Sequence, residues 1–490
     1  MFALLLAGAF VEHSVSAQNA RDLNSSTTVD VDPGRSWGKW EGWGTSLCWW
    51  AKIFGDRDDI ADLLFTTGTV DFEGQKLSGL GLNIVRYNAG ACSWNPIDGR
   101  QMVVSKTILP FRQMEGFWLD GKNTDPTSKS WDWSVDANQR AMLLKARDRG
   151  ANQFELFSNS PMWWMCGNLN PSGNASKTED NLKPENYRAF AVYLATIARQ
   201  AKEKWGIAFT TVEPFNEPIS GWWVENGKQE GCYFSSASQR NFLPVLRLEL
   251  DRRGLKEMPI AASDETNYGQ ALSTWNSFDA TTKSLIQQVN VHGYQGIRGP
   301  RSELYQAVVE HDGKPLRNSE YGDKFADGLE LARCLLLDLK KLHPTAWCYW
   351  QPLDGGNSSG WGLIQADLSK KTIGQANPKY FVLAQFTRHI RPGMTILECS
   401  ESNAVAAYDS AAHRLAMIVF NEGPARKITC DFSKFTVPDG AVASWITEPN
   451  GTAHYREEND IHLAAKKFDA TLPACSLRTF VLENVMIPLP

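Results

Sequence analysis

The sequence predicts an α/β fold, a (β/α)8 TIM barrel with an associated C-terminal antiparallel β-sandwich. Three observations indicate this class. Short apolar runs alternate with amphipathic stretches over most of the chain. Two of these runs end in a glutamate that is followed by a residue typical of turns. The C-terminal part contains only short strand-like runs separated by turn residues.

Eight runs have the length and the apolar content of buried strands. Between them lie helical stretches, of which Asn186–Trp205 and Leu329–Leu342 are the clearest because their apolar residues recur on one face. A doubly wound open sheet is the competing fold, but no Gly-x-Gly-x-x-Gly turn follows the first strand. We therefore expect a closed parallel barrel with strands near 42–48, 82–88, 153–158, 209–215, 258–263, 288–293, 315–319 and 345–350.

The domain boundaries follow from the points where the alternation of strands and helices begins and ends. Alternation at Ser26–Val31 predicts a lone strand that Pro33-Gly34 ends, and after Arg391-Pro392-Gly393 no amphipathic helix is recognisable. We expect a catalytic barrel at 38–390 and a β-sandwich formed by 22–37 together with 391–490.

The N-terminus predicts export. Phe2–Val11 is apolar but too short to span a membrane, and Val15-Ser16-Ala17 has the small-residue spacing of a cleavage site, so 1–17 is expected to be a signal peptide. No Lys or Arg precedes the apolar run, and a packed N-terminus is the alternative. No later segment is long and apolar enough to span a membrane. Four Asn-x-Ser/Thr sites fit a secreted, extracellular glycoprotein: Asn24, Asn174, Asn357 and Asn450.

Composition narrows the classes of partner. A net charge of −5 argues against nucleic acid, and the eight histidines show no ligand spacing, so we expect no metal and no cofactor. Nineteen tryptophans suit a protein that stacks on sugar rings as well as one with a large aromatic core. The nine cysteines leave at least one free thiol, and Cys166 with Cys232 is one candidate disulfide. We expect a monomer.

Two glutamates are the candidate catalytic pair. Glu217 closes the fourth expected strand in Phe215-Asn216-Glu217-Pro218, and Glu320 closes the seventh before Gly322. The C-terminal strand ends of a barrel form the catalytic face, so the two carboxylates should meet there. Either glutamate alone is more often a surface carboxylate at a turn. Together they are the minimal apparatus for hydrolysing a glycosidic bond, with Glu217 as acid/base and Glu320 as nucleophile.

Neighbouring strand ends supply further candidates. Arg86 could hold the nucleophile ionised, Asn216 could bind a substrate hydroxyl, and Tyr294 could hydrogen-bond the nucleophile. His292 could bind substrate or buffer this network. Trp350 could form the floor under the sugar and Trp163 could flank it. Packing of the barrel lip is the alternative role for the aromatic residues.

Features that look like those of clan A glycoside hydrolases stand at the strand ends: Asn216-Glu217-Pro218, Glu320, His292-Gly293-Tyr294 and Trp350. The chain also contains Gly42-Trp43-Gly44, Arg86-Tyr87-Asn88, Ser160-Pro161-Met162-Trp163, Ile390-Arg391-Pro392-Gly393 and a split sandwich. These features resemble, more narrowly, glycoside hydrolase family 30, and the resemblance covers nearly the whole mature chain.

The resemblance implies a retaining mechanism with Glu217 and Glu320 in the roles above, and substrate binding at Asn88. Trp-rich segments look most like those of the fungal endo-β-1,6-galactanases, which implies a β-1,6-galactan substrate in arabinogalactan proteins. Cys48-Trp49-Trp50-Ala51 stands where animal glucosylceramidases carry a sugar-gripping Asp, which argues against a glucosylceramide pocket.

Other readings remain open at this stage. A β-1,6-glucanase or a xylanase of the same family would use the same pair, and a non-catalytic carbohydrate-binding protein would explain the tryptophans. A barrel lyase or aldolase would need a Schiff-base lysine on a strand or a metal cluster, and neither is recognisable.

Overall fold

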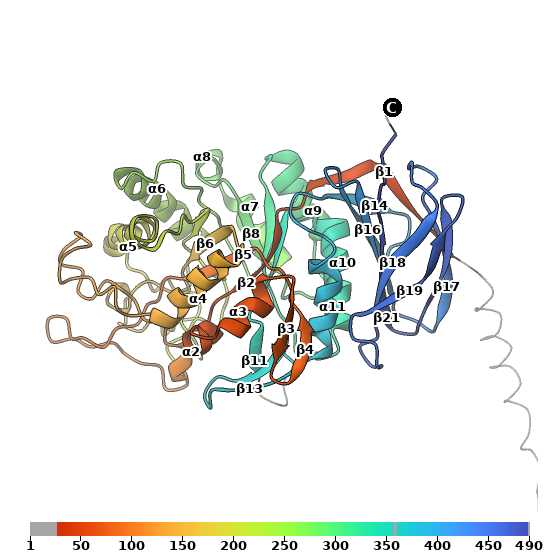
Figure 1. Cartoon of the computed structure of the whole chain (residues 1–490). Coiled ribbons are helices and arrows are strands. Elements are labelled where there is room, and N and C mark those ends of the chain that lie inside the picture. The colour runs from red at the N-terminus through yellow and green to blue at the C-terminus, as the bar shows by residue number, and fades with distance from the viewer. Residues whose placement is uncertain (1–26, 356–359, 489–490) are drawn as a thin grey trace, which may run out of the picture. The chain divides into compact units, whose positions relative to one another are not determined.

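A computed structural model describes residues 27–355 and 360–488, which divide into two compact units (Figure 1). The larger unit is Gly38–Gly393, and the smaller one combines the residues before Gly38 with those from Met394 onward. The expected signal peptide and the sites Asn24 and Asn357 lie outside the described residues. Among the described helices, none has the length and apolar character needed to span a bilayer.

The larger unit is built on a parallel sheet of short, buried strands. Their order is β7-β6-β5-β2-β10-β9-β8, so the first and last strands in the chain order of the barrel are neighbours, as closure requires. Register is parallel throughout, with Gly44 opposite Ile84 and Cys348 opposite Gly44. The strands are β2 (Gly42–Ser46), β5 (Ile84–Asn88), β6 (Gln153–Phe157), β7 (Thr211–Glu213), β8 (Val289–His292), β9 (Leu316–Tyr321) and β10 (Ala346–Tyr349).

The expected fifth strand, 258–263, closes the barrel without forming a regular strand. Single parallel bridges join Ile260 to Val212 on one side and Ala261 to Gln288 on the other. The prediction of an element there is right, but its ladder is interrupted. Asp264 follows it with a positive φ of 61°, which turns the backbone out of strand geometry.

Helices cover the barrel strands in the expected alternation (Figure 1). α5 continues through a wider helical turn at Ala201–Trp205 and α10 through another at Asp338–Leu342, so both predicted helical stretches are present. The helices are α2 (Trp50–Phe54), α3 (Asp58–Phe65), α4 (Ala137–Asp148), α5 (Tyr187–Gln200), α6 (Ser236–Arg252), α7 (Tyr268–Ser277), α8 (Ala280–Ser284), α9 (Arg301–Tyr305), α10 (Leu329–Leu337) and α11 (Pro378–Thr387).

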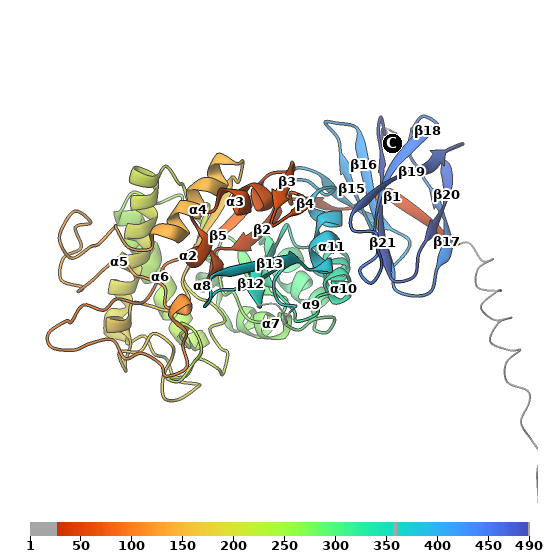
Figure 2. The same ribbon diagram turned by 60° about the horizontal axis from the view of Figure 1, so that its bottom comes forward.

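Two small sheets accompany the barrel. β3 (Thr69–Phe72) and β4 (Gln75–Ser78) form a hairpin after α3. β11 (Leu353–Gly355), β12 (Ile364–Asp367) and β13 (Thr372–Ala376) form a three-stranded sheet after β10, with β12 and β13 side by side (Figure 2).

The smaller unit is one curled sheet whose strands all contribute side chains to one hydrophobic core. Residues facing this core alternate with exposed ones, most clearly in β20, which is the pattern of a β-sandwich. The strands are β1 (Thr27–Lys39), β14 (Thr395–Cys399), β15 (Ala404–Asp409), β16 (Arg414–Asn421), β17 (Arg426–Asp431), β18 (Gly440–Thr447), β19 (Arg456–Leu463), β20 (Lys467–Leu472) and β21 (Ser476–Leu482).

Two details of this unit differ from expectation. β1 does not end at Pro33-Gly34 but continues to Lys39. Its ladder with β17 covers Thr27–Asp30, so Pro33 lies beyond these paired residues and its missing N–H interrupts no bond of that ladder. β1 also pairs in parallel with β17, with Val29 opposite Cys430, so the sheet is not wholly antiparallel. The nine cysteines are all free thiols, Cys166 and Cys232 included.

Candidate active site

The C-terminal ends of four barrel strands bring the predicted polar residues together. Arg86 lies on β5, Glu217 follows β7, His292 ends β8 and Glu320 lies near the end of β9. All four side chains are almost completely buried. Glu217 has a positive φ of 51°, and its amide donates to Asp264 O at 2.8 Å, which fixes the backbone at this turn.

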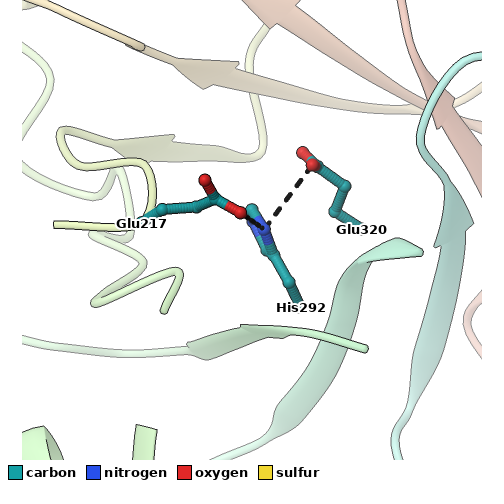
Figure 3. Close-up of side chains that lie close together, drawn as sticks. All are labelled: Glu217, His292 and Glu320. Atoms are coloured by element: carbon teal, nitrogen blue, oxygen red, sulfur yellow. Dashed lines mark hydrogen bonds and ion pairs between the residues drawn. The ribbon is translucent and has the colours of Figure 1, made fainter. Parts of the chain in front are cut away.

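Glu217 and Glu320 face each other across the imidazole of His292 (Figure 3). His292 Nδ1 lies 3.2 Å from Glu217 Oε1 and 3.5 Å from Glu320 Oε1. One carboxylate oxygen of each glutamate and a His292 nitrogen all lie within 4.8 Å of one another. This spacing is too short to admit a water between the carboxyl groups, as an inverting glycosidase requires, and fits direct attack by one of them.

Arg86 holds Glu320 in place. Its guanidinium donates through Nη1 to Glu320 Oε2 at 2.8 Å, through Nε to Glu155 Oε1 at 2.9 Å and through Nη2 to Asp264 Oδ2 at 2.5 Å. Its Cζ also lies 4.3 Å from the centroid of the Phe157 ring. Because one planar guanidinium binds three carboxylates, the carboxylate of Glu320, the candidate nucleophile, has little freedom to rotate.

Asp264 contacts the residues that hold the two glutamates. Its Oδ2 lies 3.1 Å from His292 Nε2, and its Oδ1 accepts from Ser319 Oγ at 2.5 Å. Burial alone would raise the pKa of Asp264, but the positive charges of Arg86 and His292 lower it to about 2. Asp264 is therefore ionised and pairs with two cations at once.

The charge of His292 follows from these neighbours. Burial disfavours the imidazolium, yet Glu320 and Asp264 outweigh burial and raise the pKa of His292 to about 10. Burial also raises the pKa of Glu320, while the charges of His292 and Arg86 oppose that effect. The site thus holds a permanent cation between its two candidate catalytic carboxyl groups.

The same three groups have the ligand types of a metal site, with Glu217, His292 and Glu320 close together. Nε2 of His292 faces Asp264 Oδ2 at 3.1 Å, and Nδ1 faces the two glutamates. The arrangement suits proton transfer between these groups and a bound substrate.

Above the pair opens a cavity of about 820 Å³. Glu217, Glu320, Asn216, Tyr294 and Trp350 line it, and Trp350 meets Trp49 edge to face at 5.2 Å. A second cavity of about 610 Å³ shares the lining residues Asp354 and Gly355 with the first. The second cavity lies next to the first and is lined by residues of the β12–β13 turn.

The predicted site residues divide into three groups. Asn216, Tyr294 and Trp350 line the cavity, and the Asn216 amide oxygen is buried without a protein partner. Arg86 and His292 lie behind the glutamates and hold them. Asn88 and Trp163 are buried among protein groups: Asn88 Nδ2 faces Glu230 Oε2 at 3.4 Å, and Trp163 Nε1 donates to Ser93 Oγ at 2.7 Å.

Several residues of the site escaped the sequence reasoning. Asp264 could have been recognised, because it stands in a polar run directly after the fifth expected strand. Trp222 and Arg112 line the cavity from loops, where no periodicity marks an inward-facing side chain. Trp49 lies in the segment noted for replacing an Asp, and Arg112 Cζ is 4.6 Å from the centroid of its ring.

Comparisons with known proteins agree with this geometry. A family model described as O-Glycosyl hydrolase family 30 matches residues 26–292. An endo-beta-1,6-galactanase of Hypocrea rufa is 49% identical over 474 residues, which cover 96% of this chain and 97% of that protein. An exo-beta-1,6-galactobiohydrolase of Bifidobacterium longum subsp. longum is 22% identical over 88% of this chain and 35% of its own length. The catalytic domain of a GH30 xylanase C from Talaromyces cellulolyticus superposes with a TM-score of 0.68 at 19% identity, covering 93% of this chain and 99% of that one.

Proposed function

Because the chain belongs to glycoside hydrolase family 30, and is thus an O-glycosyl hydrolase, we propose that it is a retaining endo-β-1,6-galactanase. Its substrate is β-1,6-linked galactan of the kind found in the side chains of arabinogalactan proteins. The observation that carries the choice of sugar is 49% identity, over nearly the full length of both chains, to an enzyme of that name.

Double displacement is the mechanism that the carboxyl spacing supports. Glu320 attacks the anomeric carbon while Glu217 gives its proton to the leaving glycosidic oxygen, and a galactosyl ester of Glu320 forms. Water then attacks the anomeric carbon, Glu217 takes a proton from it, and the ester bond to Glu320 breaks. The two carboxylate oxygens within 4.8 Å of each other support this route over a single displacement.

The cation of His292 fits both halves of this reaction. When Glu217 has released its proton, it becomes a carboxylate in a buried site, and the imidazolium 3.2 Å away offsets the cost of that charge. The guanidinium of Arg86 does the same for Glu320 when water releases it from the ester. Neither cation has to lose or gain a proton during the cycle.

The cavity supports binding of one sugar over the pair. Trp350 offers an apolar ring as the floor, and the unpartnered amide oxygen of Asn216 can accept from a substrate hydroxyl. Trp49 stands beside Trp350 as an aromatic wall. This aromatic wall favours stacking on the apolar face of a sugar.

Endo action is supported by the second cavity beside the catalytic one. A pocket that ended at the glutamates would admit only a chain terminus. Here a neighbouring cavity shares the lining residues Asp354 and Gly355 and reaches the β12–β13 turn, which offers room for further sugars of the chain. Secretion, suggested by the N-terminal sequence and the Asn-x-Ser/Thr sites, and action as a monomer complete the proposal.

Product analysis tests the function directly. The purified enzyme is incubated with β-1,6-galactan, β-1,6-glucan and glucuronoxylan, and the products are separated by chromatography. Galactose oligomers of several lengths from the first polymer alone are expected. Galactobiose as the sole product would replace endo by exo action, and release from the glucan or xylan instead would overturn the choice of sugar.

A further inference from the structure

Trp222 places a large aromatic ring at the mouth of the catalytic cavity. It lines the cavity close to Glu217, and 49% of its surface is exposed, which is rare for an indole. Its neighbour Trp223 is only 1% exposed. Adjacent tryptophans thus have opposite environments, one forming core and the other facing the cavity.

The buried Trp223 anchors this segment against Glu217. Its Nε1 donates to the backbone oxygen of Glu217 at 2.8 Å, and its ring fills the space above Gly231, where an added Cβ would come within 1.9 Å of it. The amide of Glu225 also donates to Asn174 O at 2.9 Å. The backbone that carries Trp222 is therefore held on both sides, and the exposure of its ring follows from the fold of the segment.

The indole of Trp222 also touches the acid/base candidate. Its Nε1 donates to Glu217 Oε2 at 3.0 Å, while the other oxygen, Oε1, faces His292 Nδ1 at 3.2 Å. Both carboxylate oxygens are thus fixed by donors on opposite sides. Without the indole, Glu217 would be held at Oε1 only and could rotate about its last bond.

The position of Trp222 identifies the part of the substrate that it meets. A general acid must lie beside the leaving oxygen, so the sugar that departs is next to Glu217. The aromatic pair Trp350 and Trp49 lies elsewhere around the cavity, in contact with each other and not with Trp222. The exposed ring nearest the acid is that of Trp222, and ring faces of this kind stack on the apolar faces of sugars.

On the basis of the proposed function, we propose that Trp222 forms the subsite for the departing galactosyl unit and, through its N–H, positions Glu217 to protonate the leaving oxygen. Occupation of the subsite and orientation of the acid are then coupled through one side chain. When a substrate extends past the cleaved bond, its departing sugar packs on the Trp222 ring. The same side chain orients Glu217, so the leaving oxygen is protonated efficiently.

Two substitutions separate the functions of this residue. Trp222→Phe keeps an aromatic face and removes the N–H, whereas Trp222→Ala removes both. Trp94→Phe, at an indole 55% exposed and outside the cavity lining, is the matched control. Each variant is assayed on a β-1,6-galactan oligosaccharide and on the 2,4-dinitrophenyl glycoside of β-1,6-galactobiose, whose leaving group needs no proton.

Loss of one hydrogen bond to a carboxylate should lower kcat on the oligosaccharide about 10-fold in Trp222→Phe, with KM nearly unchanged. Loss of the ring should in addition raise KM about 3- to 10-fold in Trp222→Ala. On the dinitrophenyl glycoside, kcat/KM reports only the formation of the galactosyl ester. It should stay near the wild-type value in Trp222→Phe, because this leaving group needs no proton.

The control separates failure of the inference from failure of the proposed function. If the wild type cleaves galactan and Trp222→Phe matches Trp94→Phe in kcat on the oligosaccharide, or loses as much on the dinitrophenyl glycoside as on the oligosaccharide, Trp222 does not position the acid. If Trp222→Ala leaves KM unchanged, the departing sugar does not pack on it. If the wild type does not cleave galactan, the proposed function fails, and the dinitrophenyl comparison is repeated with the sugar that it does cleave.

Discussion

Tyr294 donates a hydrogen bond of 2.7 Å from its hydroxyl to Glu320 Oε1, the oxygen that also faces His292. Arg86 occupies the other oxygen, Oε2. The nucleophile candidate is therefore bonded on both oxygens, by a neutral donor and by a cation. Of these donors, only Tyr294 lines the cavity. Its hydroxyl can therefore stay bonded to Glu320 while this group changes from carboxylate to ester and back.

Tyr294→Phe removes this donor and keeps the ring. Because a hydrogen bond to a charged group contributes about 1.5–3 kcal/mol, kcat/KM should fall about 10- to 100-fold. Steady-state kinetics on a galactan oligosaccharide provide the measurement. Wild-type kinetics in this variant would mean that Arg86 alone is enough to hold the nucleophile.

Glu320→Gln should abolish turnover, with a loss of about 1000-fold or more, because an amide cannot form the galactosyl ester. The folded state should persist, since the shape of the side chain is kept, although the buried ion pair with Arg86 is lost. Loss of activity with a cooperative thermal unfolding transition retained is the expected pair of results. Glu185→Gln, at an exposed carboxylate, is the control for the chemistry of the substitution, and turnover by Glu320→Gln at the wild-type rate would refute the nucleophile assignment.

Glu217→Gln should behave differently from Glu320→Gln. The variant cannot protonate a sugar leaving group, so cleavage of galactan should nearly cease, whereas a dinitrophenyl glycoside should still form the galactosyl ester. A burst of dinitrophenol followed by slow turnover is expected, because water then lacks its general base. Equal losses on both substrates would instead assign Glu217 a structural part.

The charge of His292 predicts how stability depends on pH. Its pKa rises from an ordinary value of 6.5 to about 10 in the folded protein, because Glu320 and Asp264 outweigh the effect of burial. A raised pKa contributes stability that is complete below about pH 6.5 and is lost as the pH rises towards 10. The comparison is the free energy of unfolding of the wild type and of His292→Gln, measured by denaturant titration across this range.

The difference between the two proteins should be largest at the acidic end and shrink as the pH rises. Groups far from His292 titrate alike in both proteins and cancel in the difference, whereas Asp264 and Glu320 are coupled to His292 and contribute to it. A difference that stayed constant from pH 6 to 10 would mean that His292 is neutral in the folded protein.

The barrel was predictable from sequence because its strands are short, buried on both faces and separated by helices with a clear apolar face. The segment at 258–263 was found for the same reason. It forms only single bridges, and Asp264 after it has a positive φ that no local sequence pattern predicts. β1 was cut short in the prediction because Pro33-Gly34 normally ends a strand, whereas the chain stays extended to Lys39, beyond its ladder with β17.

That Glu217 and Glu320 lie close together was predictable, because Glu217 follows one barrel strand, Glu320 lies near the end of another, and the C-terminal ends of barrel strands share one face. Loop residues offered no such constraint. Trp163 was expected at the sugar, yet it is fully buried and bonded to Ser93, while Trp222, in a loop without periodicity, faces the cavity. Which tryptophan of a Trp-rich loop is exposed depends on long-range contacts such as that between Trp223 and Gly231, and these are invisible in one sequence.

The second cavity predicts that catalysis improves with substrate length. Its lining joins that of the catalytic cavity at Asp354 and Gly355 and ends at the exposed turn around Ser369. Ser369→Trp should fill this space without disturbing the glutamates. In the wild type, kcat/KM should rise with each added galactose until the groove is full, and in Ser369→Trp the rise should stop earlier, while the shortest substrates are cleaved as before. A rise that continued unchanged in the variant would place the additional sugars elsewhere, on the side of Trp222.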